Sequence, residues 1–147
     1  MELKNVNVGR AEGFEYNGTV KHKENPIYIN GRKTYPRDKQ TSINALVHAN
    51  YECEIDCSHP TFIRRNSGKK YTEPHHLVPM AYSGMFEVSL DREQNIISLC
   101  SNCHNQIHYG IDSDKSSISL TYILSLESIC TLVVERLSSN SCVHLFH

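Results

Sequence analysis

The structural plan of this chain is read most directly from residues 95–104, which have the sequence NIISLCSNCH. The segment Asn95–Leu99 is short, apolar and β-branched, which predicts a strand. The segment Cys100–Tyr109 that follows suits a helix, and Gly110 is a typical residue to end it. The pair Cys100 and Cys103 therefore lies at the start of the predicted helix.

Upstream of this stretch, Tyr71–Pro79 predicts a first strand that ends at Pro79, and residues 80–94 predict a loop around Gly84. Apolar residues at Ile43, Leu46 and Val47 follow helical spacing, so a helix is expected over Arg37–Asn50. A short strand-like piece at Ile27–Ile29 stands within an otherwise irregular beginning. This mixture of helices and strands predicts an α+β fold.

The chain is expected to have three parts. Residues 1–36 form an irregular basic N-terminal segment, residues 37–112 form the domain, and residues 113–147 form a Ser- and Leu-rich tail that could be a packing helix. The length of 147 residues suits one domain. The hydrophobic share of 39% can supply a packed core.

Composition narrows the class of protein. The 15 Lys and Arg balance 16 Asp and Glu, which excludes a histone-like, generally basic protein. No run of 18 apolar residues and no apolar leader are visible, so we expect a cytoplasmic protein with no membrane partner. Disulfides are rare in that compartment, so 6 Cys together with 9 His point to metal binding.

The basic residues are concentrated in the first half of the chain, in two clusters that flank the first cysteine pair. One cluster runs from Lys21 to Lys39 and the other from Arg64 to Lys70. This placement favours a polyanionic partner over a merely solvated face. The candidate nucleic-acid contacts are Lys33, Arg37, Arg64, Arg65, Lys69 and Lys70.

Two cysteine pairs have the spacing of a structural zinc site. Cys100 and Cys103 form a C-x2-C knuckle, and Cys53 and Cys57 form a C-x3-C pair upstream. The extra residue in the second pair leaves His59 open as a substitute ligand, although Cys57 is preferred. Four protein ligands would close the coordination shell, so this zinc is expected to be structural.

Histidines lie between and after these cysteines. His104 and His108 are one turn apart on the predicted helix, so both imidazoles can face one ion. The adjacent pair His75 and His76 is the available source of a third ligand. Three histidine ligands leave open positions, which is what a catalytic metal needs.

Taken together, His75-His76, Asn95 and His104 resemble the motif of the HNH endonucleases. The segments 73–79 and 95–104 look like the zinc-knuckle branch of that family, which includes phage nucleases and modification-dependent restriction enzymes. The resemblance covers about residues 37–110. It implies a small ββα-metal (His-Me finger) nuclease domain with a four-Cys zinc site and an N-terminal helix.

The resemblance also implies roles for individual residues. His75 and His104 would hold a single divalent ion, with His108 as a further ligand, and His76 would be the general base. Asn95 would brace the hairpin loop by hydrogen bonds. Glu73 or a backbone carbonyl could orient His76, and the sequence leaves that choice open.

The expected function is metal-dependent hydrolysis of DNA phosphodiester bonds, with duplex DNA favoured by the resemblance alone. The catalytic ion is left open among Mg²⁺, Mn²⁺, Ni²⁺ and Zn²⁺. The alternative is a zinc-stabilised DNA-binding module without catalysis, which would need none of His75, His76 and His104. No immunity-type protein partner is expected, and the oligomeric state is left open.

Overall fold

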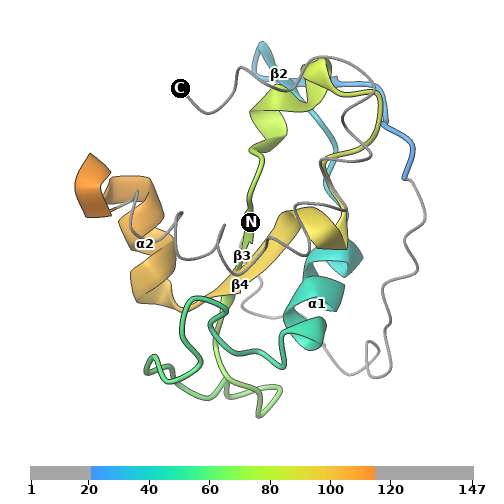
Figure 1. Cartoon of the computed structure of the whole chain (residues 1–147). Coiled ribbons are helices and arrows are strands. Elements are labelled where there is room, and N and C mark those ends of the chain that lie inside the picture. Colours follow the sequence, from blue (N-terminus) through green and yellow to red (C-terminus); the bar gives the residue numbers. More distant parts are fainter. Residues whose placement is uncertain (1–20, 115–147) are drawn as a thin grey trace. The chain divides into compact units, whose positions relative to one another are not determined.

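The computed structural model describes residues 21–114, so expectations for residues 1–20 and for the tail from 115 onward lie outside it. Contacts between Cα atoms divide the chain into Met1–Asn105 and Gln106–His147, and this boundary falls within the last helix. In chain order the elements are β1 Ile27–Ile29, β2 Arg32–Thr34, α1 Lys39–His48, β3 Glu73–His76, η2 Met80–Met85, η3 Glu93–Asn95, β4 Ile96–Leu99 and α2 Ser101–Tyr109 (Figure 1).

The antiparallel pair β3–β4 is the centre of the first unit. Its register places His75 opposite Ile97 and His76 opposite Ile96. Every residue of β4 is buried, because α1 packs against both strands of the pair. Because the strand is covered in this way, its sequence is a nearly continuous run of apolar residues.

Helix α1 is placed by its first residues and by one apolar face. The side chain of Asp38 caps it by accepting a hydrogen bond from the backbone N–H of Gln40 at 2.9 Å. Ile43 and Leu46 form a buried cluster with Tyr51, which follows the helix. Asn50 and Tyr51 both have left-handed backbone angles, with φ of 52° and 55°, and this turn brings the Tyr51 ring back onto the helix.

The strand expected at Ile27–Ile29 is confirmed, and it pairs with a second strand, β2, that was not expected. Asn30 and Gly31 connect the two strands with φ of 50° and 75°. Two positive φ angles in a two-residue loop are the signature of a type I′ hairpin, for which Asn-Gly is a preferred sequence.

The other expected elements are confirmed with shorter bounds. The helix expected over residues 37–50 is α1, the strand expected over 71–79 is β3, and the strand and helix expected over 95–109 are β4 and α2. The expected loop 80–94 contains the short helical segments η2 and η3. The α+β content is therefore confirmed.

Helix α2 ends as predicted at Gly110, whose backbone N–H bonds to the carbonyl of Gln106 at 2.8 Å. A Cβ at this glycine would lie 2.5 Å from that carbonyl oxygen, so a side chain would force the helix end apart. No helix within residues 21–114 is long and apolar enough to cross a membrane.

Candidate active site and metal centres

The side chains of the two adjacent histidines of β3 lie on opposite faces of the strand. Side chains alternate along a strand, so His75 lies on the side of Glu73, and His76 lies on the other side. His75 contacts His104 at the beginning of α2, whereas His76 contacts Asp91 in the loop before η3. The pleat of the strand thus separates these two imidazoles without any special loop.

On the α2 side, three histidines form one group. The rings of His75 and His104 meet edge to face with centroids 5.4 Å apart. The helix is continuous from Ser101 to Tyr109, which places His108 one turn after His104. One ring nitrogen from each of His75, His104 and His108 lies within 4.8 Å of the others, so the group could hold a metal ion.

Glu73 orients one member of this group, His104. Its carboxylate lies 2.7 Å from Nδ1 of His104, and it also accepts a hydrogen bond from the Ser101 hydroxyl at 2.9 Å. A histidine that donates from Nδ1 to a carboxylate presents the lone pair of Nε2, which is the arrangement usual for metal-binding histidines. The three donors are thus chemically suited to a divalent transition ion.

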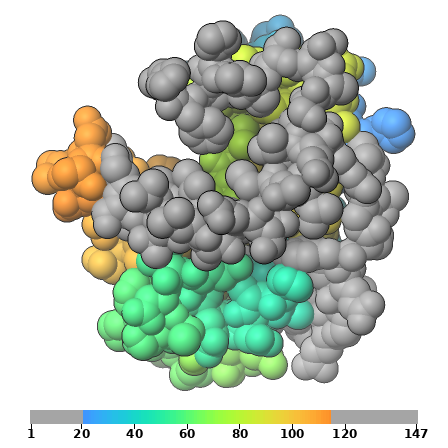
Figure 2. All heavy atoms as spheres, in the orientation of Figure 1, coloured from blue at the N-terminus to red at the C-terminus, as the bar shows by residue number. Residues whose placement is uncertain are grey.

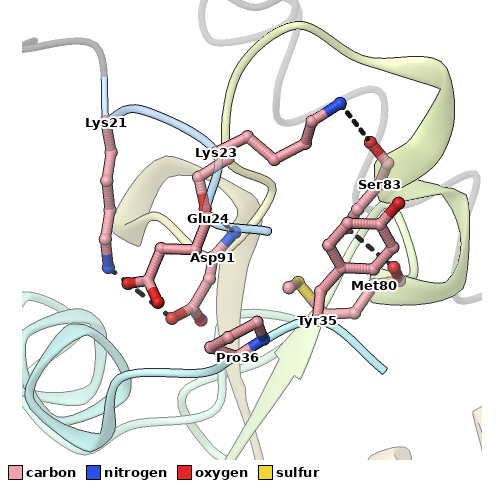
Figure 3. A pocket seen from close by; sticks show the side chains of 9 residues that line it. Lys21, Lys23, Glu24, Tyr35, Pro36, Met80, Ser83 and Asp91 are labelled. Atoms are coloured by element: carbon pink, nitrogen blue, oxygen red, sulfur yellow. Dashed lines mark hydrogen bonds and ion pairs between the residues drawn. The ribbon is translucent and has the colours of Figure 1, made fainter. Parts of the chain in front are cut away.

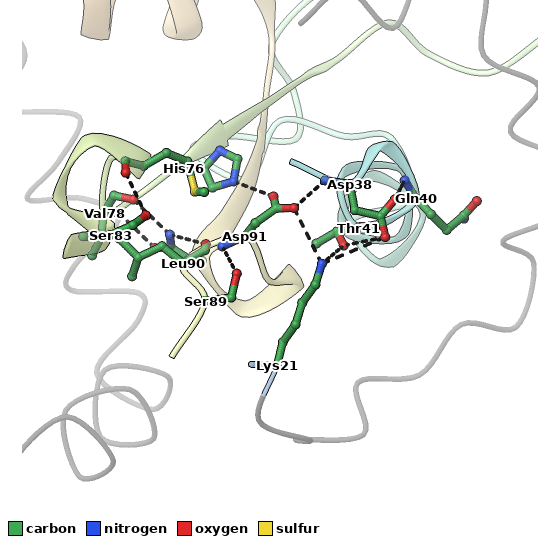
Figure 4. A network of polar contacts seen from close by, with 12 residues as sticks. Lys21, Asp38, Gln40, Thr41, His76, Val78, Ser83, Ser89, Leu90 and Asp91 are labelled. Atoms are coloured by element: carbon green, nitrogen blue, oxygen red, sulfur yellow. Dashed lines mark hydrogen bonds and ion pairs between the residues drawn. The ribbon is translucent and has the colours of Figure 1, made fainter. Parts of the chain in front are cut away.

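On the opposite face, His76 is held by a buried carboxylate. Its Nε2 lies 3.0 Å from Oδ1 of Asp91, and the two side chains are 11% and 2% exposed. The other oxygen of Asp91 accepts the backbone N–H of Asp38 at 2.5 Å, and Lys21 Nζ lies 3.6 Å from it (Figure 4). Asp91 therefore joins His76 to the beginning of α1.

The surroundings of Asp91 keep it negatively charged. Burial by itself raises the pKa of this carboxyl. The hydrogen bonds from His76 and from the Asp38 N–H, together with the Lys21 ammonium, outweigh burial and hold the pKa below its usual value. An ionised Asp91 can only accept, so Nε2 of His76 is the donor and carries the proton. The lone pair of the neutral ring is then on Nδ1.

Asn95 ties together the two ends of the loop between the strands. Its side-chain oxygen accepts the N–H of Val78 at 2.9 Å. Its amide donates to the carbonyls of Val78 and Leu90 at 3.0 and 2.9 Å. These bonds match the bracing that the family resemblance implies, and they fix Leu90 and hence Asp91 relative to β3.

A second group of potential metal ligands lies at the junction of β4 and α2. It consists of Cys53, His59, Cys100 and Cys103, whose ligand atoms are all within 4.8 Å of one another. Nδ1 of His59 lies 3.5, 3.7 and 3.3 Å from the sulfurs of Cys53, Cys100 and Cys103. Tetrahedral zinc with ordinary Zn–S and Zn–N bonds would place nitrogen about 3.5 Å from each sulfur. The group therefore fits zinc.

The sequence favoured Cys57 as the fourth member of this group, with His59 as the alternative; the structure brings His59 into the group and leaves Cys57 exposed. A turn at Asp56 brings His59, in place of Cys57, into the group. Asp56 accepts the backbone N–H of Ser58 through its side chain and that of His59 through its carbonyl. This turn directs the residue two positions after Cys57 towards the other cysteines, and Asp56 Oδ2 lies 4.0 Å from Nε2 of His59.

The electrostatics of the cysteines also favour a cation. Burial raises the pKa of Cys53, but backbone N–H groups, led by that of Cys100, and the His59 ring outweigh it and lower this pKa to about 7. Burial and the neighbouring sulfurs raise the pKa of Cys103. Clustered thiols ionise together only when a positive ion balances them.

Comparison with known proteins agrees with this geometry. Residues 53–110 match the family model "HNH endonuclease", a range that contains His76 and every member of the two potential metal-binding groups. This part of the chain is similar to HNH endonucleases, and the match spans less than half of the chain. It is 30% identical over 92 residues to the Type IV methyl-directed restriction enzyme EcoKMcrA of Escherichia coli strain K12, which covers 63% of this chain and 31% of that protein. The chain thus spans about a third of this curated relative.

Among solved structures, the chain is similar to the Type IV phosphorothioation-dependent restriction endonuclease ScoMcrA. The identity is 25% and the TM-score 0.46, over 71% of this chain and 18% of that one.

The basic candidates fall into two groups by their exposure. Lys33, Arg37, Arg65 and Lys69 are exposed. Arg64 and Lys70, both in the segment 61–71, have partners within the protein. Arg64 donates to the carbonyl of Thr72 and stacks on Tyr71, and Lys70 pairs with Glu52 at 2.7 Å. This segment and α1 share one face of the molecule, coloured teal to green in Figure 2.

Asp91 was not among the site residues predicted from the sequence. Glu87, Asp91 and Glu93 are equivalent as sequence signals, and only the path of the loop selects one of them. Glu73, considered as the residue that orients His76, contacts His104 instead, because it shares the His75 side of β3. The alternation of residues 73–76 was a signal that could have excluded it.

Proposed function

We propose that the HNH domain hydrolyses phosphodiester bonds of duplex DNA, with His76 as general base and a single divalent ion held by His75, His104 and His108. The observation that carries this proposal is that the two faces of β3 hold different groups. Three imidazoles converge on one side of the strand, and on the other a single imidazole is fixed by Asp91. A base must keep its nitrogen free of metal, and this separation meets that requirement.

In the proposed reaction, Nδ1 of His76 takes a proton from the attacking water while its Nε2–H stays bonded to Asp91. The water oxygen forms a bond to phosphorus, and the bond from phosphorus to the leaving 3′-oxygen breaks. Asp91 keeps the correct nitrogen available and stabilises the imidazolium that results. When bound, a divalent ion supplies positive charge to the scissile phosphate and the leaving oxygen.

We propose a separate, structural role for zinc at Cys53, His59, Cys100 and Cys103. Four protein ligands leave no position for substrate. Their chain positions join the segment after α1 to the beginning of α2, and a backbone hydrogen bond from Glu54 to Ser98 runs beside them at 2.9 Å. In a small domain the binding energy of such a zinc ion adds directly to the folding energy.

DNA is the proposed substrate because the similar protein EcoKMcrA is described as a restriction enzyme and because Lys33, Arg37, Arg65 and Lys69 are exposed. A cytoplasmic location and division of the chain at residues 36 and 112 remain predictions from the sequence. The competing hypothesis, a DNA-binding module without catalysis, requires zinc and cations but has no use for the His76–Asp91 pair.

Incubation of the full chain with methylated and unmethylated plasmid, across Mg²⁺, Mn²⁺, Ni²⁺ and Zn²⁺, tests the proposal. We expect nicked or linear plasmid with at least one ion. His76→Ala should lower the rate roughly 10²- to 10⁴-fold, because a general base contributes that much. Its DNA affinity and zinc content should match wild type.

The matched control is His48→Ala, which removes a histidine at the end of α1, outside both ligand groups. It should cleave like wild type. DNA binding by the wild-type protein without cleavage under any ion would favour the binding module, and undiminished cleavage by His76→Ala would reject the assigned base.

A further inference from the structure

The β1–β2 ribbon is the most exposed regular element in the described part of the chain. Five of its six strand residues are exposed, and Ile27, Tyr28 and Ile29 are 46%, 72% and 52% exposed. Within residues 21–114 it pairs with no third strand. A two-stranded ribbon is marginally stable alone, so apolar residues on both of its faces indicate a surface that is completed by a partner.

The charge of the ribbon identifies the kind of partner. Residues 25–37 contain Arg32, Lys33 and Arg37 and no acidic residue, although acidic residues slightly outnumber basic ones in the whole chain. The register pairs Ile29 with Arg32 and Tyr28 with Lys33, so each pair shares one face. One face therefore carries Arg32 beside isoleucine, and the other carries Lys33 beside tyrosine.

The base of the ribbon is fixed to the loop that follows His76. Before the ribbon, Lys23 donates to the carbonyl of Phe86 at 2.6 Å, and its ammonium also approaches the carbonyl of Ser83 (Figure 3). After the ribbon, the Tyr35 hydroxyl lies 3.3 Å from the point where a Cβ of Gly84 would be, so this glycine makes room for it. The two ends of the ribbon are thus anchored to η2 and to Phe86, which follows it.

We propose that the β1–β2 ribbon enters the major groove of the duplex that the HNH domain cleaves, and that Arg32 contacts base edges there. A two-stranded ribbon is one of the two elements that this groove admits. Arg32 can bond to guanine and Ile29 can contact a thymine methyl group. Lys33 on the other face would contact a phosphate. This inference rests on the proposed function only in its choice of substrate.

Binding can be tested without cleavage. The full chain carrying His76→Ala is mixed with duplexes that contain a randomised central window, and bound sequences are compared among Arg32→Ala, Arg32→Lys, Lys33→Ala and no further change. We expect a base preference that Arg32→Ala weakens roughly tenfold or more. Lys33→Ala should lower affinity for all sequences alike, with a salt slope shallower by about 0.9. Guanine N7 methylation by dimethyl sulfate should be blocked by the parent protein and restored with Arg32→Ala.

Lys39→Ala is the charge-matched control, since Lys39 is exposed on α1 and outside the ribbon. The inference is overturned if Arg32→Ala and Lys33→Ala bind and protect DNA as Lys39→Ala does. It is also overturned if Arg32→Ala weakens all sequences equally, which would place the ribbon on the phosphates. A change of oligomeric state by sedimentation, with DNA binding unchanged, would assign the ribbon to a second copy of the chain. Ribbon-dependent binding by a protein that cleaves nothing would leave this inference standing and reject the nuclease.

Discussion

Asp91 is the residue on which the proposed chemistry depends most without touching substrate. Asp91→Asn keeps an oxygen that can accept from His76 but removes the charge that favours one tautomer and pairs with Lys21. We expect kcat to fall roughly 10- to 100-fold, the cost typical of losing a supporting carboxylate, with KM little changed. The ¹⁵N shifts of His76 should report a mixture of its two neutral tautomers.

The control for Asp91 is Glu93→Gln, which neutralises a nearby carboxylate that bonds to Asn44 instead. It should leave both kcat and the His76 shifts unchanged. If Asp91→Asn lowers thermal stability but not kcat or the tautomer ratio, the residue supports the fold alone.

The exchange of His59 for Cys57 can be tested by zinc content. We expect Cys57→Ser to purify with as much zinc as wild type, because its exposed thiol is outside the group. Cys100→Ser and His59→Ala should each lose the structural zinc and unfold at lower temperature. Elemental analysis beside thermal melts checks this, and loss of zinc from Cys57→Ser alone would restore the four-cysteine site.

At the scale of the element, Asn95 holds the loop between β3 and β4 closed. Asn95→Ala removes three hydrogen bonds and leaves the buried carbonyl of Leu90 without its donor. At about 1 kcal/mol for each bond, the free energy of unfolding should fall by about 2–4 kcal/mol. Asn95→Asp would place a buried carboxylate oxygen against the carbonyls of Val78 and Leu90, so denaturant titration should find it no more stable than Asn95→Ala.

The elements also mark what sequence alone could and could not predict. Sequence spacing was enough to single out His75, His76, His104 and the pair Cys100 and Cys103 as candidate site residues, because each lies on or beside a local strand or helix. The loop residue Asp91 was not predictable, since its partners Asp38 and Lys21 are distant in sequence. The strand β2 should have been found, because Asn30-Gly31 after Ile27–Ile29 is a strong hairpin signal.

For the whole molecule, every residue assigned to metal binding or proton transfer lies before Gly110. A chain that ends at residue 112 should therefore bind zinc and cleave plasmid. Zinc content and plasmid nicking, measured beside the full chain, check this expectation. A folded, zinc-loaded but inactive short chain would assign the tail a part in DNA binding or catalysis.

Cys103 and His104 are neighbours in the first turns of α2, one in the zinc group and the other in the catalytic group. If Cys103 is displaced, His104 is displaced with it, since no residue separates them. On the proposed assignments, a newly synthesised chain would be inactive as a nuclease until it had acquired zinc. The supply of zinc in the cell would then set the fraction of the protein that is active.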